Sequence, residues 1–242
     1  ISTTCPTNSN RNTAVEIEEN LVSTIRFLDA CVAAEVPKVV FLSSGGTVYG
    51  KEHTGVCREE EEAFPITAYG VQKLGIEKIL YLYQHMYGLD YRIVRLSNPY
   101  GPYQRPDGVQ GAVTTFTWRA LHGKPIEVYG DGSVVRDYIY IEDAIDGILR
   151  IAERQGSFRL YNLGSGTGHS LNEVLQVIAG VTDKMPQVIY RSNRSVDVPV
   201  NVLDISRFRQ DFGCFEPIGL EEGIGRLVHF YEEEEYKQKG YC

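Results

Sequence analysis

Tyr69 and Lys73 are the residues whose types and spacing point most directly to chemistry. They stand four residues apart in TAYGVQKLGIEKILYLYQHMYG, whose apolar periodicity predicts a helix, so a phenol and an ammonium share one helix face. A free phenol has a pKa of about 10, and lowering it by roughly three units requires about 4 kcal/mol of preferential stabilisation of the phenolate. A neighbouring positive charge can supply part of that energy. The pair is therefore suited to a tyrosine that acts as a general base.

The elements around this pair must position it. Upstream, FLSSGGTVYG (residues 41–50) is typical of a strand that runs into a small-residue turn with several hydroxyls. Alternation of strands and helices predicts a doubly wound α/β sheet. The predicted elements are a helix over residues 13–34, a strand over 38–43, a helix over 67–87 that stops at Gly88, and a strand over 91–97.

After residue 98 the pattern loosens into Pro/Gly-rich loops, which indicates a second lobe. A helix near residues 113–122 and a short strand near 126–132 are predicted there. The segment VVRDYIYIED (residues 134–143) then predicts a strand that opens a helix near Glu142, and RLYNLGSG follows as a further strand and turn. The two lobes are therefore interleaved along the chain.

The order of these motifs resembles the extended short-chain dehydrogenases/reductases, and more narrowly the NAD-dependent nucleotide-sugar epimerases of the UDP-glucose 4-epimerase type. The resemblance runs from about residue 1 to about residue 231. It implies a Rossmann-like doubly wound parallel sheet, of which the C-terminal part is present, with a smaller interleaved substrate-binding lobe. We assign residues 1–98 and 136–154 to the NAD-binding domain and residues 99–135 and 155–242 to the substrate lobe.

The glycine turn that such a fold places after its first strand is not found at the start of the sequence. A second candidate, GSGTG at residues 164–168, has the spacing G-x-G-x-G instead of G-x-G-x-x-G. Ser170 and Glu173 form a predicted capping box, which explains the next helix start without a phosphate. The resemblance implies that the family's first four strands and glycine loop lie upstream of Ile1, so we interpret the chain as a fragment or a processed form.

The resemblance also implies a reaction. Tyr69 would remove the proton of the C4 hydroxyl of a UDP-hexose while hydride passes to NAD, and return of the hydride to the other face of the 4-keto sugar would invert C4. Lys73 would bind the nicotinamide ribose and stabilise the phenolate. The family's third catalytic hydroxyl falls at Gly45, so we assign its hydrogen bond to Thr47, with Ser44 as the second choice.

Other positions are assigned by matching motifs of the family. Asn20, Ser43 and Ser44 would lie at the cofactor, together with Tyr69 and Lys73. Asn201 stands where hexose-restricted epimerases commonly carry tyrosine, and its smaller side chain would admit an N-acetylated sugar. Among the substrate-binding assignments, Thr47 would bond the reacting oxygen. The diphosphate would be bound by Asn98, Arg136 and Arg194, the nucleoside ribose by Asp197, and the sugar by Asn201.

Three other activities were compared with this one. A sugar-nucleotide 4,6-dehydratase typically has Asp-Glu as acid and base in the turn, where this chain has Gly45-Gly46-Thr47, so dehydration is disfavoured. UDP-glucuronate decarboxylation and C4 epimerisation of N-acetylated sugars share most of the framework and stay open. A non-catalytic nucleotide-sugar-binding relative also stays open, although the presence of Tyr69, Lys73, Asn98 and Arg136 together argues against it.

The charge and composition of the chain argue against some partners and give several further expectations. The formal net charge of −8 without a basic stripe argues against a nucleic-acid partner, and no stretch reaches the roughly 20 apolar residues of a membrane span. The 5 cysteines are widely spaced and the histidines lack metal-ligand spacing, which predicts reduced thiols, no metal and a cytoplasmic protein. As in the family, we expect a homodimer through the helices at residues 13–34 and 67–87.

Overall fold

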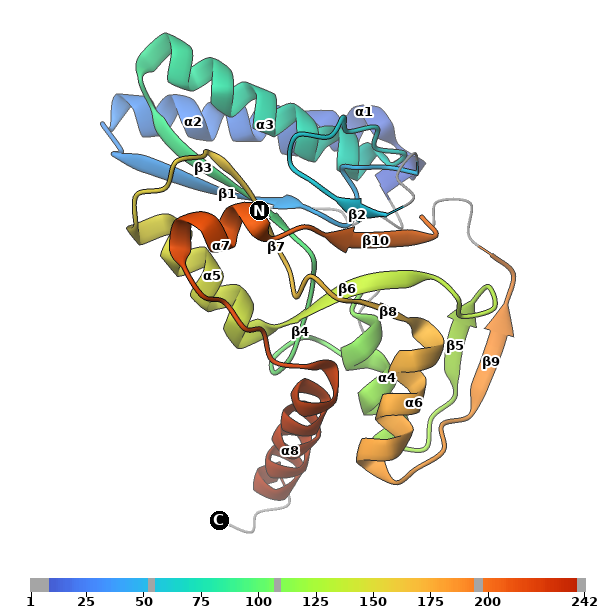
Figure 1. Ribbon diagram of the computed structural model, residues 1–242. Helices are drawn as coiled ribbons and strands as arrows, with labels where there is room; N and C mark the ends of the chain where they lie inside the picture. Colours follow the sequence, from blue (N-terminus) through green and yellow to red (C-terminus); the bar gives the residue numbers. More distant parts are fainter. Residues whose placement is uncertain (1–8, 52–54, 107–109, 194–197, 239–242) are drawn as a thin grey trace.

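The computed structural model describes residues 9–51, 55–106, 110–193 and 198–238. It contains two sheets at different levels of the molecule, with a third, two-stranded sheet beside the lower one (Figure 1). The upper level holds most of the helices and strands that precede residue 97, and the lower level holds most of the rest. The predicted α/β fold with parallel sheets is confirmed.

The first sheet is parallel and has three strands. In spatial order the strands are β1 (Lys38–Ser44), β3 (Asp90–Leu96) and β7 (Leu160–Leu163). Helices α2 (Ser23–Ala33) and α3 (Ala68–Tyr87) lie along one face, where Leu28, Ile76 and Leu80 are buried against Ile93. Helix α5 (Ile141–Glu153) covers the other face, so the central strand is enclosed on both sides.

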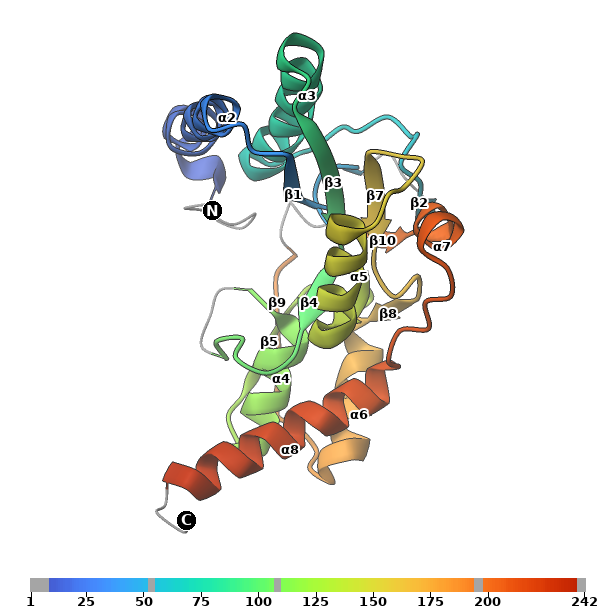
Figure 2. The same ribbon diagram turned by 90° about the vertical axis from the view of Figure 1, so that its left-hand side faces the viewer.

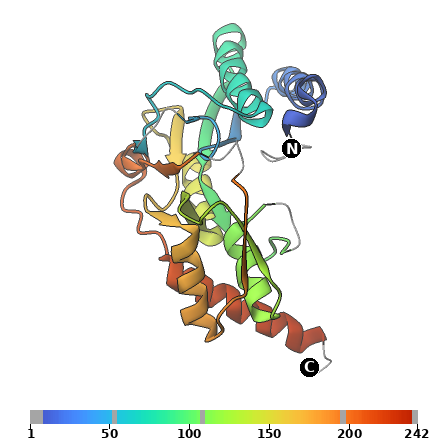
Figure 3. The same ribbon diagram turned by 90° about the vertical axis from the view of Figure 1, so that its right-hand side faces the viewer.

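The second sheet carries several of the predicted site residues. Its strands in spatial order are β2 (Val56–Cys57), β10 (Val200–Leu203), β6 (Val135–Tyr140) and β4 (Asn98–Tyr100), with β8 (Gly168–Ser170) antiparallel to β6. Strands β5 (Ile126–Tyr129) and β9 (Val188–Arg191) pair separately. Helices α4 (Ala112–Leu121), α6 (Leu171–Thr182) and α8 (Leu220–Gln238) share a hydrophobic core with these strands. Figures 2 and 3 show α8 at the end of the molecule opposite α2 and α3.

Local signals fix the ends of α3 as predicted. Thr67 Oγ1 accepts a hydrogen bond from the Gly70 amide at 3.1 Å, which caps the helix start. At the other end Gly88 adopts a φ of 71°, a left-handed conformation that glycine tolerates best. The capping box of Ser170 and Glu173 at the start of α6 is also confirmed.

The first helical stretch differs from the single regular helix predicted over residues 13–34. It begins as α1 (Thr13–Glu16), passes through a π-helical segment η2 (Ile17–Val22), and continues as α2. Asn20 Nδ2 donates to the Glu16 carbonyl at 3.1 Å, and Thr24 Oγ1 donates to the Asn20 carbonyl at 2.7 Å. The Asn20 carbonyl also accepts the backbone amide of Ser23, so side-chain and backbone donors both bond carbonyls of this segment.

Strand pairing bears on the proposed division into lobes. Strand β7, which lies in the range assigned to the substrate lobe, pairs with β3 in the first sheet, whereas β6 lies in the second sheet. The division itself stays a prediction. Two short helices complete the elements, η1 (Ser9–Arg11) and α7 (Ser206–Phe212). Cys31, Cys57 and Cys214 carry free thiols. None of the helices in the described ranges is both long and apolar enough to cross a membrane.

Candidate active site

Tyr69 and Lys73 lie in the first turns of α3, beside the end of β1. Lys73 Nζ donates to the Leu42 carbonyl at 2.9 Å. The same nitrogen lies 5.4 Å from the centroid of the Tyr69 ring and 4.9 Å from that of Phe41. Burial lowers the pKa of Lys73. The structure therefore brings the predicted pair together, with the ammonium between the phenol ring and the strand.

The residues before α1 hold the start of α3. Asn10 Oδ1 accepts from the Ala68 amide at 2.7 Å, and Ser9 Oγ accepts from the Tyr69 amide at 3.1 Å. These bonds satisfy amides that the first turn of a helix leaves without partners inside the helix. A segment about 60 residues upstream thereby helps to fix the orientation of the Tyr69 backbone.

The turn after β1 packs against the same helix turn. A Cβ atom at Gly70 would lie 3.0 Å from the Thr47 carbonyl and 2.7 Å from Pro65 Cβ, so only glycine allows this approach. The Thr47 amide donates to the Ser44 carbonyl at 3.3 Å, which closes the turn. Thr47 therefore lies next to the residue that follows Tyr69.

The Thr47 hydroxyl is buried and makes no hydrogen bond within the described part of the chain. Buried hydroxyls in folded proteins nearly always have a partner. An orphaned hydroxyl at this place suits a hydrogen bond to a bound molecule, and it fits the sugar and nicotinamide end of the predicted site. The backbone of Ser44, the second choice, accepts the turn's amide bonds from Thr47 and Val48.

Gly45 occupies the position at which the family's catalytic hydroxyl was expected. Its amide donates to the Leu96 carbonyl at 2.8 Å, so it continues the pairing of β1 with β3. A Cβ at this position would lie 2.5 Å from Leu203 Cδ1 and 3.1 Å from the Arg95 carbonyl. The side chain of Leu203, in β10, thus fills the space that a serine side chain at position 45 would need.

Ser43 has a different environment from the one expected for a cofactor ligand. Its Oγ donates to Glu77 Oε1 at 2.5 Å, and Glu77 is held by Arg95 through Nε at 3.1 Å and Nη2 at 2.7 Å. Both charged side chains are buried. The Arg95 guanidinium also lies 4.8 Å from the centroid of the Tyr49 ring. The cofactor role of Ser43 stays a prediction, with its hydroxyl committed to this group in the structure.

Sequence reasoning missed this buried ion pair, although a signal was present. Glu77 follows Lys73 by four residues and so lies on the face of α3 that meets the sheet. Arg95 lies within a strand of which the central residues are buried. A carboxylate on a buried helix face and an arginine in a buried strand indicate a pair, because an isolated buried charge is costly.

Asn98 and Arg136 come from neighbouring strands. Asn98 pairs in register with Tyr138 of β6, and its Nδ2 donates to the Asp137 carbonyl at 2.8 Å. Arg136 Nη1 donates to the carbonyls of Val135 at 2.8 Å and Val198 at 2.5 Å. The Asn98 amide nitrogen carries two hydrogens, so it can donate one hydrogen bond beyond the one to Asp137.

Of the remaining predicted site residues, two are buried in the protein and two fall outside the described ranges. Asn20 is buried in η2, and Asn201 is buried in β10, where its Nδ2 donates to the Gly45 carbonyl at 3.0 Å. Asn201 therefore connects the second sheet to the turn that carries Thr47. Arg194 and Asp197 lie outside the described residues.

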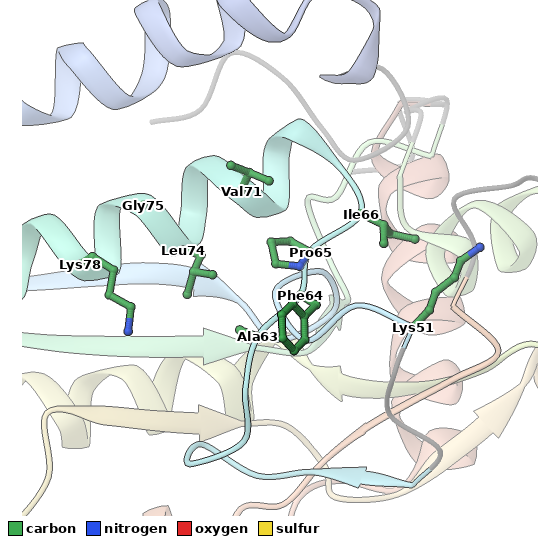
Figure 4. A pocket seen from close by; sticks show the side chains of 9 residues that line it. All are labelled: Lys51, Ala63, Phe64, Pro65, Ile66, Val71, Leu74, Gly75 and Lys78. Carbon is green, nitrogen blue, oxygen red and sulfur yellow. The ribbon is translucent and has the colours of Figure 1, made fainter.

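An apolar cavity of about 980 Å³ lies on a different side of α3. Val71, Leu74, Gly75 and Lys78 line it from the helix, and Phe64 and Ile66 line it from the preceding loop (Figure 4). Residues spaced by three and four share a helix face, and this face contains neither Tyr69 nor Lys73. The cavity is therefore separate from the chemical groups described above.

Comparisons with known proteins agree with this geometry. The model of the NAD dependent epimerase/dehydratase family matches residues 2–164. A UDP-glucose 4-epimerase of Mycolicibacterium smegmatis is 34% identical over 212 residues, which cover 88% of this chain and 68% of that protein. A UDP-glucuronate 4-epimerase of Thermodesulfobacterium geofontis is 30% identical over 223 residues, which cover 92% of this chain and 68% of that protein, so the likeness extends to more than one sugar.

Solved structures show the same likeness. The UDP-glucose 4-epimerase of Thermotoga maritima, solved with UDP-glucose, superposes with a TM-score of 0.91 at 31% identity and covers 97% of this chain and 76% of its own. The UDP-glucose 4-epimerase of Thermus thermophilus, solved in complex with NAD, gives a TM-score of 0.88 at 31% identity, with 96% and 76% covered.

Proposed function

Because this chain belongs to the NAD dependent epimerase/dehydratase family, we propose that it acts as an NAD-dependent UDP-sugar 4-epimerase that inverts C4 of a UDP-hexose through a 4-keto sugar. The observation that carries the proposal is the buried Thr47 hydroxyl, which no described residue bonds, in the turn that packs against the start of the helix with Tyr69 and Lys73. These groups are the ones that removal of a proton from a sugar hydroxyl requires.

In the proposed reaction Tyr69 takes the proton of the C4 hydroxyl and later returns a proton to the same oxygen. Lys73 favours the phenolate through its charge, because its Nζ is held 5.4 Å from the ring centroid by the Leu42 carbonyl. Thr47 Oγ1 hydrogen-bonds the reacting oxygen. NAD, when bound, supplies the hydride acceptor and donor at C4. Lys73, Ser44 and Asn20 are the described residues that we assign to its nicotinamide side.

Asn98 and Arg136 are assigned to the diphosphate of the substrate. They lie on adjacent strands of the second sheet, so their donors can converge on one anionic group. An arginine supplies planar, charged donors that match phosphate oxygens, and an asparagine adds a donor without more charge. Asn201 would influence the sugar through the Gly45 carbonyl that it binds, since its side chain is buried below the turn.

We also propose that the protein is a homodimer through the outer faces of α2 and α3. Large apolar side chains are exposed there, and the cavity of Figure 4 adjoins them. A second copy placed against this surface would cover both. The exposed residues are Phe27, Val71, Tyr81, Leu82, Met86 and Tyr87.

The test of the reaction is conversion of UDP-galactose to UDP-glucose with added NAD. The protein is assayed with Tyr69 intact and as Tyr69→Phe. Tyr81→Phe, at an exposed tyrosine of the same helix, is the matched control. We expect Tyr69→Phe to lose nearly all conversion and Tyr81→Phe to keep it. Absence of conversion by a protein that is shown to bind NAD would refute the UDP-hexose assignment.

A further inference from the structure

The glycine-rich segment at residues 164–168 surrounds an internal carboxylate, that of Asp137. Ser165 donates to Asp137 Oδ1 through both its amide and its Oγ, each at 2.8 Å. On the other oxygen, the amides of Gly166 and Leu203 donate at 3.1 and 3.3 Å. Asp137 is fully buried. Donors from two separate segments of the chain therefore meet on one side chain.

The carboxylate explains the glycine at position 164, and a positive φ favours the glycine at position 166. A Cβ at Gly164 would lie 2.4 Å from Asp137 Oδ2, and Gly166 has a φ of +76°. Consecutive amides at such a turn form a concave site for an anion, which in this protein is a side chain of its own. This agrees with the prediction that the segment is not a phosphate loop.

All four donors to Asp137 are neutral. Burial raises the pKa of Asp137, and the hydrogen bonds oppose that rise. Because every donor is an N–H or O–H group, the ionised carboxylate accepts them all, whereas a protonated or amide side chain would direct a hydrogen at one of them. The site is therefore specific for a carboxylate.

The same residue is linked to both proposed diphosphate ligands. The Asp137 carbonyl accepts from Asn98 Nδ2 at 2.8 Å, which fixes the orientation of that amide. Arg136 is the adjacent residue of β6, and it pairs in register with Asn201 of β10. The bond from the Leu203 amide ties β10 to β6 just beyond that pair. Movement of Asp137 would therefore displace Asn98 and Arg136 together.

We propose that Asp137 is a positioning residue for substrate binding: its carboxylate, held by residues 165, 166 and 203, sets the place of Asn98 and Arg136 for a nucleoside diphosphate. This inference rests on the proposed function, because it takes these two residues as the diphosphate ligands. Asp137 itself touches no substrate.

The test is calorimetric binding of UDP to the protein and to its Asp137→Asn variant. We expect about tenfold weaker binding by the variant, because an amide placed against four donors must turn away from at least one of them. Asp143→Asn is the matched control, since Asp143 of α5 likewise accepts a backbone amide, that of Ile218 at 2.8 Å, but contacts neither ligand. Asp143→Asn should bind UDP as the unchanged protein does.

A double-mutant cycle with Asn98→Ala separates positioning from general loss of structure. If Asp137 acts through Asn98, the effect of Asp137→Asn on UDP binding will be smaller in the Asn98→Ala background. Should Asp137→Asn fail to fold, Ser165→Gly removes one donor while keeping the backbone, and the same cycle is measured with it.

The outcomes separate the two hypotheses. If the unchanged protein binds UDP and Asp137→Asn binds it equally well, the positioning role is wrong. The role is also wrong if the effects of Asp137→Asn and Asn98→Ala on UDP binding are additive. If the unchanged protein does not bind UDP, the proposed function fails and this inference fails with it. Weaker binding with less than additive coupling supports the role.

Discussion

At the scale of single residues, the turn after β1 shows how one side chain determines where a hydroxyl can be placed. Leu203 fills the space beside Gly45, so the turn cannot carry a side chain there without a shift. Two residues later, Thr47 has a buried hydroxyl that the described residues leave unsatisfied. The proposed catalytic hydroxyl is thus moved along the turn and not lost.

Thr47→Val should lower kcat about a hundredfold, because it removes one donor to the reacting oxygen. Thr47→Ser keeps the hydroxyl and should retain most of the activity. The unfolding free energy of Thr47→Val should hardly change, since no described hydrogen bond of Oγ1 is broken. The measurement is steady-state conversion of UDP-galactose beside urea unfolding. Full activity of the valine variant would contradict the assigned role.

Gly45→Ser should destabilise the fold by about 1 to 3 kcal/mol, because the new side chain would overlap Leu203. It should not raise activity, although it restores the hydroxyl at the position expected from the family. Gly55→Ser is the control, since a Cβ at Gly55 would meet no atom within 4 Å. Urea unfolding of both variants decides the matter, and a more active, equally stable Gly45→Ser protein would be the opposing result.

At the scale of elements, α3 is attached to the first sheet by a buried ion pair as well as by apolar packing. Glu77 receives two bonds from Arg95 of β3 and one from Ser43 of β1. Tyr69, Lys73 and Glu77 repeat every four residues, so the attachment lies on the same side of the helix as the proposed base.

Glu77→Gln should destabilise the protein by about 3 to 5 kcal/mol, because it leaves the Arg95 charge buried without its partner. Replacing both residues, as Glu77→Leu with Arg95→Met, should recover much of that loss. Glu222→Gln breaks the exposed pair with Arg226 and should cost less than about 1 kcal/mol. Equal effects of Glu77→Gln and Glu222→Gln on denaturant unfolding would show that burial of the pair is unimportant.

Helix ends were predictable where the signal is local. Thr67 and Gly88 mark the ends of α3, and Ser170 with Glu173 marks the start of α6. The π-helical segment was not predictable from periodicity, since it depends on side-chain bonds around Asn20. The sheet to which β7 belongs was also beyond local reasoning, because strand pairing depends on residues about 65 positions away.

The residues of the candidate site were likewise predictable only where the signal is local. Tyr69 and Lys73 were found because a helix fixes their spacing. The obstruction at Gly45 was not foreseeable, because Leu203 reaches it from a strand more than 150 residues later. Asp137 was likewise read as part of a strand, and its role in holding residues 164–168 depends on contacts between distant segments.

At the scale of the whole molecule, the proposed base lies on α3 beside the first sheet, and the proposed diphosphate ligands lie on β4 and β6 of the second sheet. The helices α2 and α3 form one end of the molecule, and α8 lies at the other (Figure 2). Most of α2 and α3 therefore lies away from α8, and a partner could bind their exposed apolar residues without covering that helix.

Leu82→Glu should convert the proposed dimer to a monomer, because it places a charge in an apolar interface. Leu82 shares a helix face with Val71 and is 43% exposed in the single chain. Met185→Glu is the control, since Met185 is exposed in the other lobe. Light scattering after size-exclusion chromatography gives the mass, and a monomeric unchanged protein would rule out the dimer.

The loop at residues 164–168 has a consequence for the resting protein. Its anion is part of the chain, so the loop needs no ligand to keep its shape, unlike a phosphate loop that closes around a nucleotide. The amides of Ser165 and Gly166 should therefore exchange their hydrogens with solvent deuterium equally slowly in the empty and the UDP-bound protein. A glycine-rich segment that resembles a phosphate-binding loop would then keep the same structure with and without a nucleotide.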